Sequence, residues 1–189
     1  EQPGVQAGTG TGLQPYSLDP RFSYCLFVPP RPAEHCAPPG LVVAVHDSTR
    51  NPLTFRDRFI DFAARWHQVV LAPLFPPNVR GDGNGDGYKV LMEGDIRYDE
   101  VLQGMVAEAA VRTGCDADRL FLFGYSGGGQ FVHRYLLLHP ERLRAVCAGA
   151  PGEVTLMDAA VDWWGGIRDT GIRFGRTVDI DAIRRVPIQ

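Results

Sequence analysis

The sequence predicts a single α/β domain whose core is a mostly parallel sheet with flanking helices. Two apolar runs, at 41–47 and 68–77, are continuous rather than alternating, which is typical of parallel strands buried on both faces. Segments with helical spacing alternate with such runs along the chain, as in repeated β–α units. With 189 residues, 44% of them hydrophobic, the chain can build one sizeable core. We expect this core over 21–189, after a flexible Gly- and Pro-rich arm at 1–20.

The first half of the chain is expected to contribute three strands and one helix. The first strand is an aromatic and β-branched run that stops at a pair of prolines, and the next two are the continuous apolar runs. The helix lies between those two runs, because its phenylalanines recur at helical spacing. These elements are expected at 22–30, 41–47, 54–66 and 68–77, followed by a glycine-rich loop at 78–94.

The second half is expected to contribute two longer helices and two buried strands. The first helix ends at Gly114, since glycine readily adopts the left-handed conformation that ends helices, and the second stops at Pro140. A candidate cap or specificity region at 151–178 follows, and 180–189 has the pattern of a short helix and the first residues of a strand. The helices are expected at 95–114 and 128–140, and the strands at 119–124 and 144–150.

Ser126 lies in the most informative motif of the chain. With Gly124 and Gly128 it completes the pattern G-x-S-x-G, between a predicted strand and a predicted helix. A serine at such a sharp turn adopts strained backbone angles, and the glycines let strand and helix approach closely. The turn exposes the hydroxyl and directs the free N–H groups of the helix at a developing oxyanion. The pattern predicts that Ser126 is a catalytic nucleophile; the alternative is an ordinary serine in a glycine-rich turn.

On this motif the chain resembles the α/β-hydrolase superfamily, and within it the serine esterases and polyester-depolymerase-like hydrolases. The resemblance implies an oxyanion hole made by the backbone N–H groups of Gly127 and Ser48, the latter in the stretch "VAVHDST". It also implies that His46 has a structural role and orients that loop. Asp47 stands where the family usually has glycine, so its carboxylate has to point away from an oxyanion.

The same resemblance implies an acid and a histidine that follow the nucleophile in the chain. Only His133 and His139 follow Ser126, and His133 would lie about 10 Å along the predicted helix, beyond hydrogen-bonding reach. We therefore expect the C-terminal strands of the fold to be missing from this chain. The base and the acid would come from outside it, on a second chain or fragment that carries the rest of the fold. A non-catalytic binding module with a hydrolase-like fold, and a base borrowed from His46, are the alternatives.

The loop after the third strand also matches a calcium-binding pattern. Its sequence "DGNGDGYKVLME" satisfies D-x-[DN]-x-[DN]-G-x5-E, in which carboxylate, amide and backbone oxygens surround the ion. No helix is predicted to enter the loop, so the favoured interpretation is an active-site loop of turn-forming residues, with neither a metal nor an organic cofactor. The weak calcium candidates are Asp82, Asn84, Asp86, Tyr88 and Glu93.

Aromatic residues near the predicted nucleophile are candidates for the substrate pocket. Trp163 and Trp164 precede two glycines in the cap region, and Tyr125 is adjacent to Ser126. Such residues can line a groove for an acyl chain or a polymer. The alternative for the tryptophans is that they pack the cap onto the sheet.

The predicted reaction is hydrolysis of a carboxylic ester, in a small molecule or a polymer, through an acyl-enzyme; thioester and amide hydrolysis are the alternatives within this class. The net charge of −3 gives no basic surface, so nucleic acid is not expected as a partner. No apolar run approaches the roughly 18 residues of a membrane helix. A soluble protein is expected, with the cytoplasm favoured over secretion.

Overall fold

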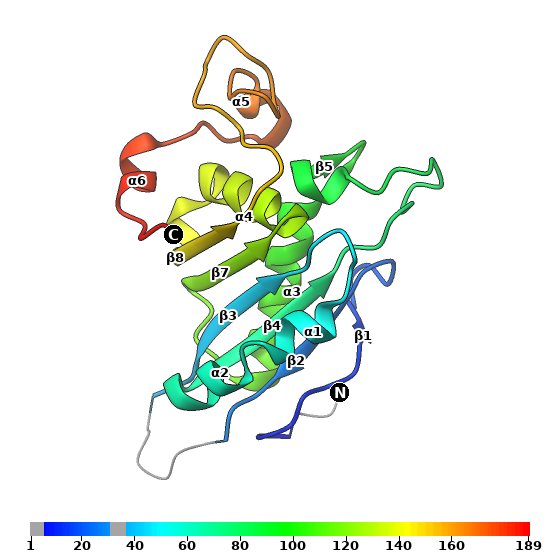
Figure 1. The fold of residues 1–189 in the computed structure, drawn as a ribbon, viewed down its shortest axis with the longest axis vertical. Coiled ribbons are helices and arrows are strands. Elements are labelled where there is room, and N and C mark those ends of the chain that lie inside the picture. The colour runs from blue at the N-terminus through cyan, green and yellow to red at the C-terminus, as the bar shows by residue number, and fades with distance from the viewer. Residues whose placement is uncertain (1–5, 31–36) are drawn as a thin grey trace.

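The computed structural model describes residues 6–30 and 37–189, and its centre is a six-stranded sheet (Figure 1). The strand order is β1-β2-β4-β3-β7-β8, and the four strands from β4 to β8 are parallel, whereas β1 and β2 are antiparallel to their neighbours. The predicted α/β fold with a mostly parallel sheet is confirmed. The strand bounds are Gln14–Pro15 (β1), Ser23–Phe27 (β2), Gly40–Val45 (β3), Gln68–Leu74 (β4), Leu120–Tyr125 (β7) and Leu143–Gly149 (β8).

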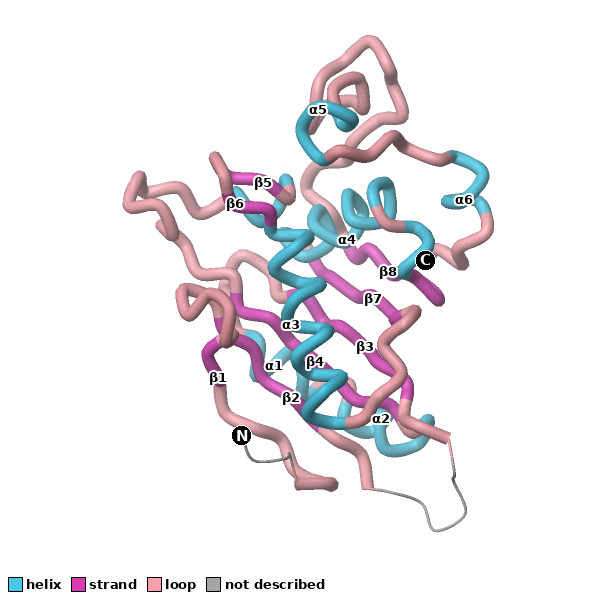
Figure 2. The backbone as a smooth tube through the Cα atoms, turned by 180° about the vertical axis from the view of Figure 1, so that it is seen from behind, coloured by secondary structure: helices cyan, strands magenta, loops and turns pink. Residues whose placement is uncertain are grey.

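Helices cover both faces of this sheet. Figure 1 shows α1 and α2 in front of it, and Figure 2, seen from behind, shows α3 and α4 on the opposite face. Two short helices, α5 and α6, follow β8, and a separate two-stranded ribbon, β5–β6, precedes α3. The helix bounds are Pro52–Asp57 (α1), Ile60–Trp66 (α2), Tyr98–Thr113 (α3), Gly127–Leu138 (α4), Thr170–Phe174 (α5) and Ile180–Arg184 (α6). The ribbon strands are Met92–Glu93 (β5) and Ile96–Arg97 (β6), and the 3-10 turns are Gly87–Val90 (η1) and Pro140–Arg142 (η2).

The side chains of the central strands alternate between two cores, because successive residues of a strand point to opposite faces. Leu41 and Val43 of β3 join the large core under α3 and α4. Ala44, their neighbour on the same strand, joins the smaller core under α1 and α2. Because these strands are buried on both faces, their sequences are continuous apolar runs rather than alternating ones.

Two predicted helices differ from the structure at their bounds. The helix expected at 54–66 is two helices, because the chain tightens at Phe59, whose N–H donates to the carbonyl of Arg56 at 3.0 Å. The helix expected at 95–114 begins only at Tyr98, since Ile96–Arg97 pairs with β5 instead. In both places the helical spacing of apolar residues runs on in the sequence, but local hydrogen bonds interrupt the helix itself.

The N-terminal segment was expected as a flexible arm over 1–20. From residue 6 onward it lies against the edge of the sheet, and residues 1–5 are outside the described part. The N–H groups of Gly8 and Thr11 donate to carbonyls of Val28 and Leu26, each at 2.8 Å. Tyr16 is buried in the large core. The open edge of β2 offers unpaired backbone groups, which explains why a segment without apolar periodicity is ordered there.

In the described ranges, no helix combines the length and the apolar character that crossing a membrane would require.

Candidate active site

Ser126 lies at the turn between β7 and α4, at the carboxyl end of the parallel strands. Its backbone has φ 54° and ψ −113°, a conformation that costs a non-glycine residue on the order of 1–3 kcal/mol. Two hydrogen bonds hold this turn: the Ser126 N–H donates to Gly149 O at 2.8 Å, and the Gln130 N–H donates to Ser126 O at 3.0 Å. The fold thus stabilises a strained, half-buried serine at the start of a helix.

The glycines on either side of Ser126 are required by close backbone contacts. A Cβ at Gly124 would lie 2.1 Å from the carbonyl oxygen of Gly128. A Cβ at Gly128 would lie 2.4 Å from that of Val45, at the end of β3. Side chains at these positions would push α4 away from the sheet, as the sequence pattern predicts.

The two predicted oxyanion residues are neighbours in the structure. The hydroxyl oxygen of Ser48 lies 3.1 Å from the position that a Cβ on Gly127 would occupy. Arg50 holds the Ser48 loop, because its Nη1 donates to the Ser48 carbonyl at 2.9 Å. The carboxylate of Asp47 accepts hydrogen bonds from the N–H and the hydroxyl of Thr49, at 2.8 and 2.5 Å. The carboxylate of Asp47 is thereby bound within its own turn.

His46 is fully engaged in the loop that follows β3. Its Nδ1 donates to the carbonyl of Asp47 at 2.7 Å, and its Nε2 accepts from the N–H of Phe75 at 3.0 Å. Burial lowers the pKa of His46 to about 4, so the ring is neutral at physiological pH. With both ring nitrogens bonded, His46 orients this loop and cannot take a proton from Ser126.

The other described histidines also have their own partners. The Nε2 of His133 bonds to the backbone of Thr155, at 3.0 Å from its nitrogen and 3.1 Å from its oxygen. His67 follows α2 at the amino end of β4, the opposite edge of the sheet from Ser126. His35 lies outside the described residues. Among the histidines that the structure describes, none is therefore placed as a base for the predicted nucleophile.

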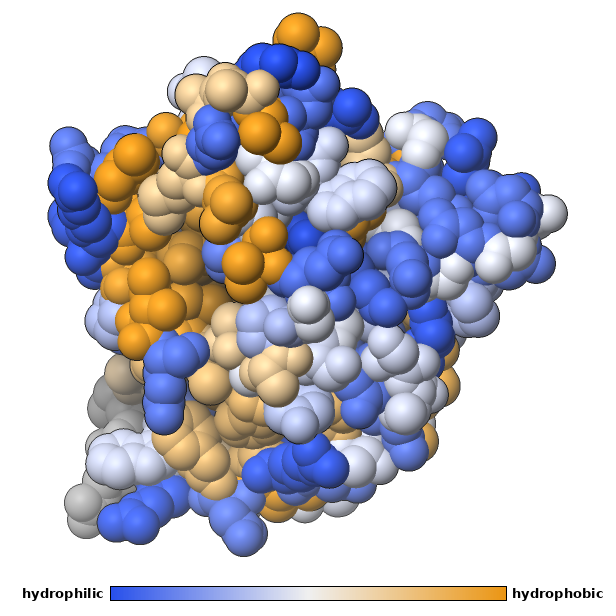
Figure 3. Space-filling model, turned by 45° about the horizontal axis from the view of Figure 1, so that its top comes forward, coloured by the Kyte–Doolittle hydropathy of each residue, from blue (hydrophilic) through white to orange (hydrophobic). Residues whose placement is uncertain are grey.

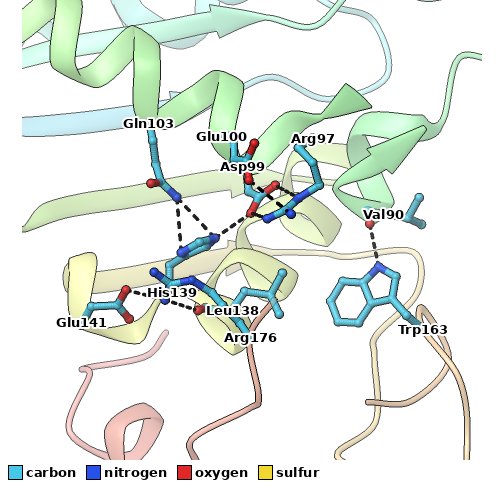
Figure 4. A network of polar contacts seen from close by, with 10 residues as sticks. All are labelled: Val90, Arg97, Asp99, Glu100, Gln103, Leu138, His139, Glu141, Trp163 and Arg176. Atoms are coloured by element: carbon cyan, nitrogen blue, oxygen red, sulfur yellow. Dashed lines mark hydrogen bonds and ion pairs between the residues drawn. The ribbon is translucent and has the colours of Figure 1, made fainter. Parts of the chain in front are cut away.

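His139 belongs to a buried polar network that connects α3 with the end of α4 (Figure 4). Its Nε2 lies 2.7 Å from Oδ2 of Asp99, and Arg97 donates to both oxygens of that carboxylate, at 2.9 and 2.7 Å. Burial alone would raise the pKa of Asp99, but the hydrogen bonds from His139 and Arg97 hold it below its ordinary value. The network resembles a catalytic pair in its chemistry, yet it lies at the far end of α4 from Ser126 and serves packing.

A buried arginine connects the rim of the site to α4, and the sequence pattern did not reveal it. Arg134 donates from Nε to the hydroxyl of Thr155 at 2.9 Å and from Nη1 to the carbonyl of Lys89 at 2.8 Å. Its side chain is inaccessible to solvent, and burial lowers its pKa to about 10. One guanidinium thus joins the loop before α3 and the start of the cap region to the nucleophile's helix.

A pocket of about 510 Å³ lies between these two segments at the rim. Trp164, one of the predicted substrate residues, lines it and is half exposed. Trp163 does not line it: the indole is 6% exposed, donates to the carbonyl of Val90 at 2.8 Å (Figure 4) and packs against Phe174. Trp163 therefore packs within the cap region and against the turn that carries Val90. Tyr125 is exposed beside Ser126 and is not among the residues that line this pocket.

The calcium candidates are engaged in hydrogen bonds of their own loop. The side-chain oxygens of Asp82 and Asn84 each accept from the N–H two residues on, at 3.0 and 2.8 Å. Asp86 pairs with Lys89, the Tyr88 carbonyl accepts from Leu91, and the buried Glu93 accepts from the Tyr98 hydroxyl. In residues 6–30 and 37–189, no three His, Cys, Asp or Glu side chains are grouped so that they could hold a metal ion. Asp82 and Asn84 thus form turns of the kind that such residues favour, and calcium binding by this loop stays a prediction.

Comparison with solved structures identifies the fold. The chain is similar to poly(aspartic acid) hydrolase-1 from Sphingomonas sp. KT-1, with a TM-score of 0.69 and 21% identity, over 88% of this chain and 64% of that one. It is also similar to a poly(3-hydroxybutyrate) depolymerase from Bordetella parapertussis, with a TM-score of 0.67 and 24% identity, over 88% and 59%. An S-formylglutathione hydrolase from Agrobacterium tumefaciens matches with a TM-score of 0.57 and 23% identity, over 88% and 63%.

These similarities confirm the α/β-hydrolase fold that the sequence motif predicts. The chain spans 59–64% of the length of the three structures. No protein family and no curated protein matches the sequence.

Proposed function

We propose that this chain carries the nucleophile of a serine hydrolase that cleaves carboxylic esters. The observation that carries the proposal is the strained backbone of Ser126 at the start of α4, beside Gly127 and Ser48. A strained residue is retained where function requires it, and this turn presents a hydroxyl to helix N–H groups. The names of the similar structures, which include a depolymerase and an S-formylglutathione hydrolase, support this class of reaction.

The proposed reaction proceeds through an acyl-enzyme. The hydroxyl oxygen of Ser126 attacks the ester carbonyl carbon while its proton passes to a histidine, and the carbonyl oxygen becomes an oxyanion. The backbone N–H groups of Gly127 and Ser48 donate to that oxyanion, each contributing roughly 10²–10³ in rate. The histidine returns the proton to the leaving alcohol, and water then hydrolyses the Ser126 ester.

We infer that the histidine and its acid come from a polypeptide segment outside these 189 residues. Two features of the far edge of the sheet support this inference. Residues 187–189 pair in parallel with β8, where Val146 and Ile188 form a bridge and the Val146 N–H donates to Pro187 O at 2.9 Å. Next to this edge lies an apolar groove of about 560 Å³, lined by aromatic residues that include Phe62 and Phe121.

The groove lies on the same sheet face as α1 and α2, over the part next to β8 that these helices do not cover, and Figure 3 shows hydrophobic surface on the side of β8 and the chain end. A helix of the supplying segment would bury this surface while its strands extend the sheet beyond residues 187–189. Burial of apolar surface contributes roughly 25 cal/mol of favourable free energy per Å² removed from water, so it would stabilise the bound segment. The same segment would place its histidine at the carboxyl ends of the strands, where Ser126 lies.

Labelling with a fluorophosphonate tests the proposal. The purified protein, with every polypeptide that copurifies, is expected to form an adduct on Ser126, located by peptide mapping, and intact masses identify the species that supplies the base. The Ser126→Ala variant is expected to lose labelling and more than about 10³-fold of esterase activity, since the nucleophile is gone. Its melting temperature should stay within the error of the measurement. Full esterase activity in this variant would refute the role of Ser126.

The alternative is a non-catalytic binding module with the same fold. The observation in its favour is that every described histidine is bonded elsewhere. It predicts no adduct on Ser126 in any preparation and, if calcium stabilises the 82–93 loop, a melting temperature that rises with calcium. Within the enzyme class, turnover of matched ester, thioester and amide substrates distinguishes an esterase from a thioesterase or a peptidase.

A further inference from the structure

We propose that the hydroxyl of Tyr88 is a third hydrogen-bond donor to the oxyanion, beside the N–H groups of Gly127 and Ser48. This inference rests on the proposed function and adds to it a side chain that no sequence pattern assigns to catalysis. Tyr88 lies in η1, far along the chain from both β3 and α4, and its phenol reaches the turn that carries the nucleophile.

The position of the hydroxyl follows from the space beside Gly127. Oη of Tyr88 lies 2.2 Å from the point that a Cβ on Gly127 would occupy, and Oγ of Ser48 lies 3.1 Å from the same point. Both hydroxyls therefore lie beside the α-carbon of Gly127, the residue directly after Ser126. A carbonyl oxygen bound by the Gly127 N–H would enter at this place.

Gly127 itself supports this assignment. At Gly124 and Gly128, an added Cβ would meet backbone carbonyls, so the elbow alone explains those glycines. At Gly127 an added Cβ would instead meet side chains, first of all Oη of Tyr88. Glycine at this position is thus required by the tyrosine, since any larger residue would displace its hydroxyl from the site.

The Tyr88 hydroxyl is buried beside the hydroxyl of Ser48. The residue is 1% exposed, and within the described part of the chain Oη makes no hydrogen bond of full geometry, although the Ser48 side chain lies within its reach and lowers its pKa. Because a serine hydroxyl both donates and accepts, it leaves the proton of Tyr88 available to an oxyanion. Burial raises the pKa of Tyr88 to about 12, so the group keeps its proton and can donate at neutral pH.

Arg50 holds the ring in place and also holds Ser48. Its guanidinium lies 5.5 Å from the centroid of the Tyr88 ring, and it donates to the carbonyls of Ser48 at 2.9 Å and Phe75 at 3.1 Å. The ring packs further against His46, at 5.1 Å between centroids. A donor fixed in this way needs no reorganisation when the oxyanion forms, which is the condition for electrostatic stabilisation.

The test is Tyr88→Phe, which removes one oxygen atom, in the preparation that labels at Ser126. We expect kcat to fall about 10²-fold with KM unchanged, because the hydrogen bond is made to the oxyanion and not to the ground-state ester. Affinity for a trifluoromethyl ketone, which forms a tetrahedral oxyanion adduct on a serine, should fall by a similar factor. A purely structural role would not weaken this inhibitor selectively over substrate.

Tyr135→Phe is the matched control. Tyr135 is also fully buried, and its hydroxyl has no partner among the described residues, but it lies nine residues beyond Ser126, about 13 Å along α4. This variant should keep kcat and inhibitor affinity. Unchanged kcat in Tyr88→Phe, or an equal loss in both variants, would overturn the proposal. Absence of any adduct in the wild-type protein would instead refute the proposed function itself, and the donor role with it.

Discussion

Three consecutive glycines follow Ser126, and they meet different neighbours. A Cβ at Gly128 would approach carbonyl oxygens of Val45 and His46, at 2.4 and 2.6 Å, whereas one at Gly129 would approach the carbonyl of Gly149, at 2.6 Å. The helix is therefore pressed against β3 on one side and β8 on the other. At the scale of the residue, backbone atoms a few ångströms away decide that these positions of the turn can hold only glycine.

Gly128→Ala is expected to lower both stability and activity. The new methyl group would have to displace the end of β3, which costs roughly 1–3 kcal/mol of unfolding free energy in a packed region. Activity should fall as well, because the end of β3 leads into the Ser48 loop. Urea denaturation and ester hydrolysis measure the two effects. Gly12→Ala is the control: no heavy atom of residues 6–30 and 37–189 lies within 4 Å of an added Cβ there, so a change within about 0.5 kcal/mol is expected. Equal effects of the two substitutions would show that close backbone contact is not the cause.

At the scale of the element, buried polar groups fix how helices and loops meet. Arg134 joins α4 to the loops that form the rim of the pocket. Asp99, at the start of α3, joins that helix through His139 to the end of α4. Burying a charged group costs free energy, and removing one partner of a buried pair leaves the other unpaired and destabilises the protein strongly. Each of these contacts therefore favours one arrangement of the elements that it connects.

Asp99→Asn is expected to destabilise the protein by about 3 kcal/mol near pH 7, because it leaves the largely buried guanidinium of Arg97 without its negative partner. The effect depends on pH. Since the pKa of Asp99 is lower in the folded than in the unfolded state, its contribution is present above the unfolded value of about 3.9 and is lost as pH falls through the folded value. The stability difference between wild type and variant should therefore narrow below about pH 4. Urea denaturation at several pH values measures it.

The control for this prediction is Asp162→Asn. Asp162 forms a comparable pair with Arg168, at 2.6 Å, but on the surface, where such pairs contribute little. No measurable change in unfolding is expected at any pH. A constant difference between wild type and Asp99→Asn from pH 7 down to pH 3 would contradict the assigned ionisation.

At the scale of the whole molecule, one face of the sheet is covered more completely than the other. The large core under α3 and α4 extends from β2 to β8, whereas α1 and α2 cover the strands around β4. The groove beside β8 is left lined by aromatic side chains. The proposed source of the catalytic base depends on this asymmetry.

Phe62→Gln is expected to weaken binding of the segment that supplies the base, because it places an amide in the apolar groove. Fluorophosphonate labelling of Ser126 should slow several-fold when that segment is limiting, while far-UV circular dichroism stays unchanged. Val111→Gln is the matched control: Val111 is an exposed apolar residue of α3, on the opposite face of the sheet, and does not line the groove. Equal labelling rates in wild type and Phe62→Gln would argue against the groove as the binding surface.

The sequence by itself determined the parts of this protein that local pattern controls. Buried parallel strands, the turn at Ser126 and the glycines around it are encoded within a few residues, so they could be predicted. The calcium-like pattern was also local, but it does not distinguish a ring of ligands from a series of tight turns. The helical spacing of the phenylalanines likewise predicted the helix at 54–66, but it did not show that the helix is interrupted at Phe59.

Only the tertiary structure decided which distant residues meet. Tyr88 reaches Gly127, Arg134 holds Lys89, and Trp163 packs on Phe174 rather than lining the pocket, and none of these contacts leaves a periodic signal. Each of these contacts joins segments that are far apart in the sequence and that the fold brings side by side. The physical reason is that a side chain's chemistry is readable from its type, whereas its neighbours depend on how strands and helices pack.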